Sequence, residues 1–160
     1  MVNNTTFHKC LDAAYRYLSY RPRSEAEVKQ RLHQRGFDVE IVEETVIRLK
    51  EQGLIDDFAF AQFWKENRLS FKPKSKKLII KELNDRKVNR EIVEQVTKDI
   101  DDMDNACKLG RRRMHILIHL DYLGFRRRLS NYLSYRGFTY EVIKHTTALL
   151  WQEKEEGDSL

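Results

Sequence analysis

The chain has 160 residues, enough for one ordinary domain or for several small repeated units. It holds only two prolines and six glycines, which argues against a strand-rich fold and favours helices joined by short connections. Its 30 lysines and arginines against 25 aspartates and glutamates give a formal net charge of +5, which favours an anionic partner without identifying one.

Two further features exclude whole classes of protein. No apolar segment has the length of a signal-peptide core or a membrane span, which predicts a soluble, cytoplasmic protein without membrane association. Cys10 and Cys107 lie far apart and form no spaced pair, so the sequence predicts neither a disulfide framework nor a zinc site. We expect both cysteines to be small core residues.

Two helices are predicted at the start of the chain. The apolar stripe of the first consists of Cys10, Ala13, Ala14, Tyr17 and Leu18, at helical spacing. Pro22 ends that helix. Ser24 and Glu27 have the spacing of a capping box and predict a second helix from about Glu25 to Arg35, with Gly36 just past its end.

A third helix completes this first segment. Asp38 is a candidate cap for it, and Gly53 closes it. Its apolar stripe consists of Ile41, Val42, Thr45, Val46 and Leu49. The first 53 residues are therefore expected to form a three-helix unit.

An internal repeat organises the rest of the chain. The segment Leu18–Ser24 reappears 51 residues later as Leu69–Ser75, with aromatic replacing aromatic and lysine replacing arginine. A weaker third copy is marked by Tyr135–Phe138, which resembles Gln34–Phe37. The chain is thus about three units of roughly 50 residues each.

The later units repeat the three-helix pattern. In the second unit, helices are predicted to follow Asp57, Ser75 and Asn89, the last of them reaching Ile100. In the third, helices are predicted from about Met103 to Arg113, Tyr122 to Tyr135 and Tyr140 to Gln152.

The predicted fold class is all-α: three tandem three-helix, helix-turn-helix-like repeats that form an elongated molecule. The repeats are expected at residues 1–53, 54–101 and 102–152, followed by a flexible acidic tail at 153–160. A unit of this size is near the lower limit for an independent core, so neighbouring repeats should support one another.

The order and content of these repeats resemble the RecX family of bacterial recombination regulators over almost the whole chain. The resemblance is carried by Gly53–Asp57 with Phe60–Ala61, Asn67–Arg68, Phe71–Ser75 with Glu82–Leu83, and Tyr135–Phe138. Two positions differ from the family pattern. Ala59 stands where a basic residue is common, and Lys87 stands where glycine is usual. Either Lys87 adopts a positive φ or the preceding helix is capped in another way.

The resemblance implies a regulatory function in which the chain itself catalyses no reaction. Members of the family bind RecA and restrain its filament, so the chain is expected to be a negative modulator of homologous recombination and the SOS response. The expected partner is the RecA filament, and single- or double-stranded DNA is a further candidate partner. No reaction, cofactor or metal is implied. We expect a monomer, since no sustained heptad occurs.

The residues themselves offer no convincing catalytic site. His115 and His119 could face the same side of a helix, but no further ligand has a suitable spacing. A glycine-rich phosphate loop is absent, and no nucleophile turn is recognisable. The sequence therefore predicts that the chain is not an enzyme.

Basic clusters are the main candidates for contact with the partner or with DNA. They comprise Arg21 and Arg23; Lys72, Lys74, Lys76, Lys77 and Lys81; Arg111, Arg112 and Arg113; and Arg126, Arg127 and Arg128. The first two clusters occupy the same connection in successive repeats, and we expect the 72–81 stretch to be a principal electrostatic contact. Phe60, Phe63 and Trp64 are predicted to be core, whereas Tyr20 and Phe71 could belong to the core or to a stacking surface.

One rival interpretation remains open. Each repeat could be a helix-turn-helix that binds nucleic acid directly, with the basic loops on phosphates. A recognition helix needs exposed Arg, Asn or Gln side chains, yet the helix of residues 38–52 presents mainly glutamate on its polar side. This favours a protein partner.

Overall fold

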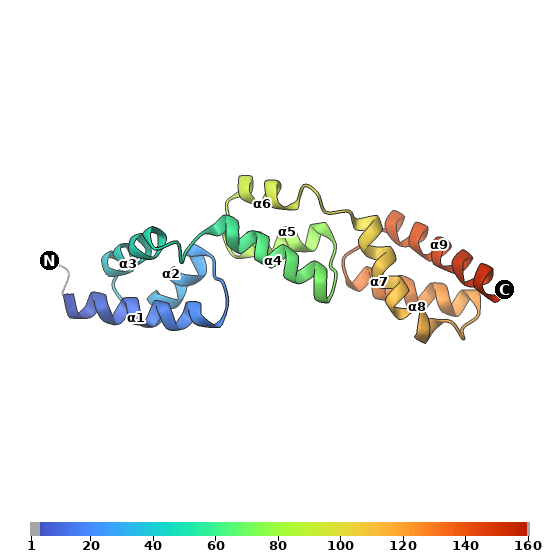
Figure 1. The fold of residues 1–160 in the computed structure, drawn as a ribbon, viewed down its shortest axis with the longest axis horizontal. Helices are drawn as coiled ribbons and strands as arrows, with labels where there is room; N and C mark the ends of the chain where they lie inside the picture. The colour runs from blue at the N-terminus through green and yellow to red at the C-terminus, as the bar shows by residue number, and fades with distance from the viewer. Residues whose placement is uncertain (1–3, 160) are drawn as a thin grey trace. The chain divides into compact units, whose positions relative to one another are not determined.

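The computed structural model describes residues 4–159, which form nine α-helices and no strand (Figure 1). The helices are α1 (Asn4–Tyr20), α2 (Glu25–Gln34), α3 (Val39–Glu51), α4 (Asp57–Phe71), α5 (Lys76–Asp85), α6 (Arg90–Thr97), α7 (Asp102–Leu117), α8 (Tyr122–Tyr135) and α9 (Tyr140–Asp158). They follow one another as three groups of three, so the predicted all-α class and its tandem three-helix repeats are confirmed.

Capping residues begin several helices where the sequence predicts them. Ser24 and Glu27 form the full capping box of α2, with each side chain bonded to the other residue's backbone N–H. Asp38 occupies the N-cap position of α3 but its side chain forms no capping hydrogen bond. Asp121 and Thr139 cap α8 and α9 through the backbone N–H groups of Gly124 and Val142.

The second helix of every repeat ends in the same way. Gly36, Lys87 and Gly137 all have positive φ, at 89°, 59° and 87°. At each end the next residue donates a backbone hydrogen bond to a leucine carbonyl five residues before it, the pattern of a Schellman cap. Lys87 therefore adopts the left-handed conformation, which settles the question left by the sequence.

By packing, the chain divides into two compact units. The first comprises Met1–Lys65 and Glu82–Val96, and the second comprises Glu66–Lys81 and Thr97–Leu160. This division passes through α4 and α5, so the units do not coincide with the repeats read from the sequence. The repeat boundaries at residues 53 and 101 stay a prediction.

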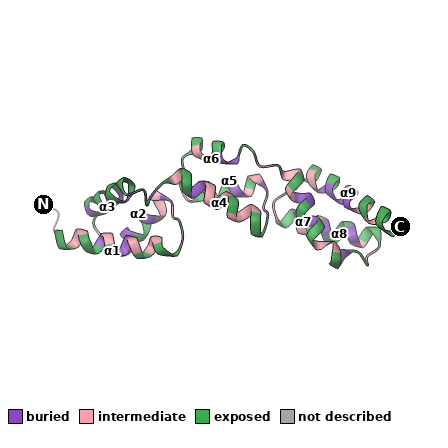
Figure 2. Ribbon diagram, in the orientation of Figure 1, coloured by how far each residue is buried: buried purple, intermediate pink, exposed green. Residues whose placement is uncertain are grey.

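Each unit has its own apolar core, and buried positions recur along each helix (Figure 2). One cluster joins α1, α2 and α3 through fully buried residues such as Cys10, Leu32 and Leu49. The other joins α7, α8 and α9 through Phe125, Leu129 and other buried residues. In Figure 2 the buried residues are purple and the exposed residues green.

The predicted core residues behave largely as expected. Cys10 and Cys107 are both buried and unpaired. Phe60 and Trp64 are buried, and Phe63 is half-buried.

Three helix ends differ from the prediction. Helix α6 ends at Thr97 rather than at Ile100, and α7 continues to Leu117. The acidic segment after Gln152 is not an irregular tail, because α9 continues through Asp158. Side chains one turn apart hold this last part, where Trp151 donates to Glu155 and Lys154 pairs with Asp158.

Candidate anion-binding surface

A recurring joint connects the start of one repeat's second helix to the end of the next repeat's second helix. In the first joint, the Ser24 hydroxyl at the start of α2 donates to the Arg86 carbonyl at 2.9 Å. The Glu25 backbone N–H donates to the Asp57 carboxylate at 2.8 Å. Backbone groups that the helix ends leave unpaired are satisfied across the joint.

The second joint repeats these contacts within the other unit. The Ser75 backbone N–H donates to the Arg136 carbonyl at 3.0 Å, and the Lys76 backbone N–H donates to the Asp102 carboxylate at 2.8 Å. Serine and aspartate thus stand at corresponding places in both joints. The basic connection between the first and second helices of each of the first two repeats ends at one of these joints.

The arginines of the first joint contact other residues of the protein. Arg21 pairs with Glu27 at 2.6 Å, and the Arg86 guanidinium carbon lies 3.7 Å from the centre of the Trp64 ring. Arg23 stacks on Tyr17 at 4.0 Å and donates to the Tyr17 carbonyl. Arg21 and Arg23 are therefore engaged within the protein, a role that the sequence alone does not distinguish from partner contact.

Glu27 is the negative centre of this joint. Its side chain is only 14% exposed and lies 3.7 Å from Arg86 as well as beside Arg21. Burial raises the pKa of Glu27, but hydrogen bonds from Arg21 and from the Ser24 N–H, together with the charges of Arg21 and Arg86, outweigh it. The pKa of Glu27 is therefore below its ordinary value.

Most lysines of the second joint are more exposed to solvent than Arg21 and Arg23 of the first. Lys72, Lys77 and Lys81 are exposed, whereas Lys74 and Lys76 are half-buried. Phe71, at the end of α4, is 76% exposed, and its counterpart Tyr20 is 83% exposed. Both rings that the sequence left undecided thus lie on the surface beside basic residues.

The three arginines of α7 are directed to different surroundings. Arg111 pairs with Glu153 of α9 at 2.7 Å, and this hydrogen bond holds the pKa of Glu153 below its ordinary value. Arg113 stacks on the Tyr132 ring at 4.0 Å. Arg112 is exposed. The run of three does not form one binding patch.

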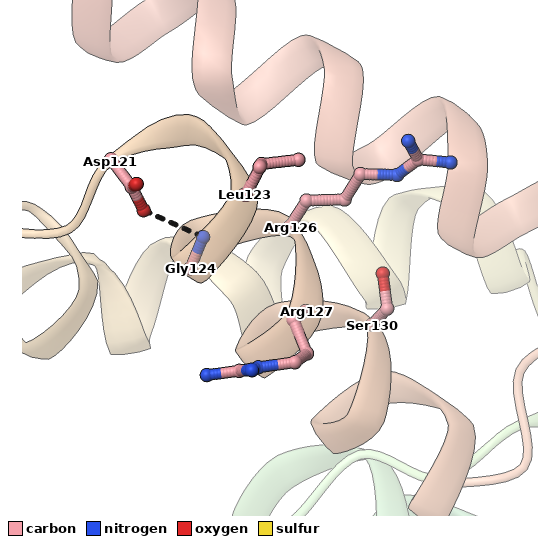
Figure 3. Close-up of a pocket in the computed structure, with 6 residues that line it drawn as sticks. All are labelled: Asp121, Leu123, Gly124, Arg126, Arg127 and Ser130. Atoms are coloured by element: carbon pink, nitrogen blue, oxygen red, sulfur yellow. Dashed lines mark hydrogen bonds between the residues drawn. The ribbon is translucent and has the colours of Figure 1, made fainter.

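Arg126, Arg127 and Arg128 on α8 are all exposed, and none of them forms an ion pair with another described residue. A shallow hollow of about 520 Å³ lies over this part of α8. It is lined by Asp121, Leu123, Gly124, Arg126, Arg127 and Ser130 (Figure 3). Figure 3 shows Arg126 and Arg127 leaving the helix in different directions, so their guanidinium groups lie well apart.

Comparison of α5 and α8 brings out a basic pair that repeats. Lys76 and Lys77 stand just before the buried Ile79 of α5, as Arg126 and Arg127 stand just before the buried Leu129 of α8. The corresponding residues of α2 are Glu25 and Ala26, so the first repeat lacks the pair. We call these four residues, Lys76, Lys77, Arg126 and Arg127, the dibasic pairs.

Sequence reasoning missed two residues of this surface, Tyr132 and Arg136. Arg136 is the counterpart of Arg35 and Arg86 at the end of each second helix. That recurrence is a signal in the sequence, but only the fold shows that Arg136 lies against the Tyr132 ring, 5.5 Å from its centre.

The histidines and cysteines provide no comparable site. His115 lies in the last turn of α7, but His119 lies beyond the end of that helix, so the two are not on one helical face. Among residues 4–159 no three His, Cys, Asp or Glu side chains are grouped so that they could hold a metal ion. None of the described helices combines the length and apolar character needed to span a membrane.

Comparison with known proteins identifies relatives over most of the chain. Residues 10–49 match the first three-helix domain of RecX, and residues 99–146 match its third three-helix domain. The regulatory protein RecX of Mycobacterium sp. (strain JLS) is 34% identical over 134 residues, covering 79% of this chain and 73% of that protein. That of Finegoldia magna is 24% identical over 155 residues, covering 93% of this chain and 75% of that protein.

Solved structures show the same fold. The crystal structure of RecX from Lactobacillus salivarius superposes with a TM-score of 0.73 at 22% identity, covering 90% of this chain and 96% of that one. A second crystal structure, of a regulatory protein RecX, gives a TM-score of 0.70 at 20% identity, covering 89% of this chain and 71% of that one. At these identities the likeness establishes the arrangement of helices.

Proposed function

Because the chain belongs to the RecX family of regulatory proteins, we propose that it binds the RecA–DNA filament and inhibits or disassembles it. In this role it is a negative modulator of homologous recombination and of the SOS response. It has no catalytic activity of its own, and any change in ATP hydrolysis is exerted on RecA.

The observation that carries the proposal is the recurrence of the dibasic pairs. The same two positions of α5 and α8 present cations, and Lys77, Arg126 and Arg127 are exposed. A filament is a regular, strongly anionic polymer because of its DNA, and repeated cationic contacts suit a repeated target. Several weak contacts on one chain also give substantial avidity when they engage together.

The acidic face of α3 supports a protein component in the target. Glu40, Glu44 and Glu51 are exposed on this helix, and none of them pairs with another described residue. Such a surface repels phosphates, so α3 does not serve as a recognition helix in a DNA groove. A filament offers both protein and DNA, which suits a chain with acidic and basic faces.

The test compares two charge-reversed double variants with a matched control. Lys76→Glu/Lys77→Glu and Arg126→Glu/Arg127→Glu each reverse one dibasic pair. Lys9→Glu/Arg16→Glu reverses two exposed cations of α1 and changes the net charge equally. We expect both test variants to inhibit the ATPase of a DNA-bound RecA filament at least tenfold less potently, with the control unchanged.

Measurement across a salt series separates the two components of the target. If the lost contacts are to phosphates of duplex DNA, the slope of log K against log salt becomes shallower by about 0.9 for each of them. Wild-type inhibition by a variant lacking both dibasic pairs would contradict the proposal. Helicity and melting of every variant are checked by circular dichroism.

A further inference from the structure

A groove lies between α8 and α9 in the second unit, with a volume of about 300 Å³. Phe138 and Ile143 belong to its lining, and because they are only 5% and 9% exposed they give it a recessed apolar floor. The lining also includes the hydroxyl and amide side chains of Ser130, Asn131 and Ser134. An apolar floor with a few polar groups around it is typical of a ligand-binding site.

Two cations line this groove, one from each helix. Arg126 of α8 and Lys144 of α9 are both exposed, and neither forms an ion pair with another described residue. Figure 3 shows Arg126 and Ser130 extending to one side of α8, while Arg127 extends to another. None of the described residues that line the groove is acidic. The groove therefore carries positive charge that its own lining does not neutralise.

An ion pair spans the corresponding place in the first repeat. Lys29 and Glu43 lie 101 residues before Ser130 and Lys144, which is the spacing between the glycines that follow α2 and α8. Lys29 pairs with Glu43 at 3.1 Å and so connects α2 to α3. In the third repeat a short serine replaces the lysine and a cation replaces the glutamate, so this bridge cannot form. The third repeat therefore keeps open the place that the first repeat spans.

The lining indicates a ligand that has carboxylates on either side of an apolar group. From Arg126 to Ser134 the groove follows α8 for about 12 Å, the length of about four residues of an extended peptide. Hydroxyl and amide groups along it can hydrogen-bond a peptide backbone, and the recessed floor suits an aliphatic side chain. Stacking of nucleic-acid bases needs open ring faces, which the buried Phe138 does not offer. The groove therefore favours a peptide.

We propose that this groove binds an acidic segment of a partner protein, in which an aliphatic side chain enters the groove and flanking carboxylates pair with Arg126 and Lys144. We call it the α8–α9 groove. The inference goes beyond the proposed function, which is carried by the dibasic pairs and assigns no role to α9. Arg126 is the one residue that the two share, so changes at Ser130 and Lys144 test the α8–α9 groove alone.

The experiment titrates a synthetic peptide into the isotope-labelled full chain and follows the backbone amides by nuclear magnetic resonance. The peptide consists of glutamates with one central leucine. We expect saturable shifts confined to α8, α9 and the turn between them. A second peptide, with serine in place of leucine, should bind about tenfold more weakly, because it has no aliphatic side chain to bury in the groove.

A double variant installs the ion pair of the first repeat. Ser130→Lys/Lys144→Glu copies Lys29 and Glu43, so the new bridge should span the groove and weaken binding of the leucine peptide at least about tenfold. Lys144→Gln removes one cation and should weaken it about threefold. Arg48→Gln, at an exposed arginine of α3, lowers the net charge by as much as either variant and should bind like wild type. Circular dichroism melting shows whether each variant is folded.

Several outcomes would overturn the proposal. Equal binding of the leucine peptide by wild type and by Ser130→Lys/Lys144→Glu would place the peptide elsewhere, and equal binding of the two peptides would remove the role of the apolar floor. Larger shifts of the same amides with an oligothymidine than with the leucine peptide would make the groove a nucleic-acid site. Shifts that depend on protein concentration without peptide would place a second copy of the chain there.

Filament inhibition is assayed in parallel to keep the two proposals apart. Loss of peptide binding in Ser130→Lys/Lys144→Glu with retained filament inhibition supports the α8–α9 groove and shows that the proposed function does not depend on it. A wild-type chain that binds the leucine peptide but does not inhibit the filament contradicts only the proposed function.

Discussion

Lys87 occupies a backbone conformation that glycine holds at the two corresponding positions. Its φ of 59° closes α5, and its neighbour Val88 donates to the Leu83 carbonyl as Phe37 and Phe138 donate in the other repeats. A side chain in the left-handed region meets its own backbone, which costs about 1 kcal/mol. The closing hydrogen bonds form despite this strain.

Lys87→Gly should therefore stabilise the protein. We expect the free energy of unfolding to rise by about 1 kcal/mol and the melting temperature to rise by about 3 °C. Lys87→Ala is the matched control, because it removes the lysine side chain and keeps the strain. An equal gain in both variants would show that the side chain, rather than the backbone, is the source of the effect.

Glu27 should make stability depend on pH in the acid range. The pKa of Glu27 is lower in the folded protein than the ordinary value of about 4.3, so its contribution is complete above that pH and is lost as the pH falls through the lower folded value. Glu27→Gln removes the negative charge between Arg21 and Arg86 and should destabilise by about 2 kcal/mol at pH 7.

The difference between wild type and Glu27→Gln isolates this effect from other acids. Asp57 must be separated because burial raises its pKa, and its contribution therefore changes with pH in the opposite sense. We expect the gap in urea midpoints to narrow steadily below pH 4. A gap that is the same at pH 7 and pH 3 would contradict the assignment.

The two glycines that follow α2 and α8 have different surroundings. Both have φ near 90°, but a Cβ at Gly36 would meet no atom within 4 Å. A Cβ at Gly137 would lie 2.5 Å from Leu78 Cγ and 2.6 Å from Ser75 Oγ. Gly137 is therefore needed both for the turn and for the close approach of the second joint.

Gly36→Ala and Gly137→Ala form a matched pair for this difference. Gly36→Ala should lower the free energy of unfolding by about 1 kcal/mol, from backbone strain alone. Gly137→Ala should lower it by about 2 to 4 kcal/mol, because the joint must also shift. Equal losses of unfolding free energy in the two variants, measured by chemical denaturation, would show that the second joint accommodates the added Cβ without further destabilisation.

The helices could be predicted from the sequence because their signals are local. The capping box of Ser24 and Glu27 and the apolar stripe of α3 lie within a few residues of one another and appear in the structure as predicted. The continuation of α9 into the segment after Gln152 was missed for the opposite reason. Its acidic composition is typical of a tail, but Glu153 pairs with Arg111, which lies 42 residues earlier.

The candidate site could be predicted only in part, since charge identifies cations but not their neighbours. Arg21 and Arg126 look alike in the sequence, yet the fold uses Arg21 against Glu27 and leaves Arg126 on the surface. Whether a cation is already paired within the protein depends on contacts between residues that are distant in sequence, such as Ser24 and Arg86, which are 62 residues apart. The contacts of the predicted binding residues with a partner stay a prediction.

Each compact unit holds one buried cysteine. Cys10 belongs to the first unit and Cys107 to the second. Burial raises the pKa of the Cys10 thiol, which makes it a weaker nucleophile in the folded state. The two thiols can therefore report on the opening of the two units separately.

We expect both thiols to react slowly with a thiol reagent in the native protein. Gly137→Ala loosens the second unit, so it should accelerate labelling of Cys107 more than labelling of Cys10. Mass spectrometry of the labelled peptides measures the two rates in one sample. Equal acceleration at both cysteines would show that the units open together.

The joint also has a consequence for adding repeats to such a chain. In the first joint, the second, third and sixth residues of α2, namely Ala26, Glu27 and Gln30, share a hollow with the Arg86 end of α5. In the third repeat, Leu123, Gly124 and Arg127 lie in the first two turns of the longer helix α8 and line the open hollow of Figure 3. The start of α8 thus has a hollow where the starts of α2 and α5 have a joint. Length in this architecture is an adjustable property, because a further repeat grafted beyond α9 could dock there without rebuilding the repeats before it.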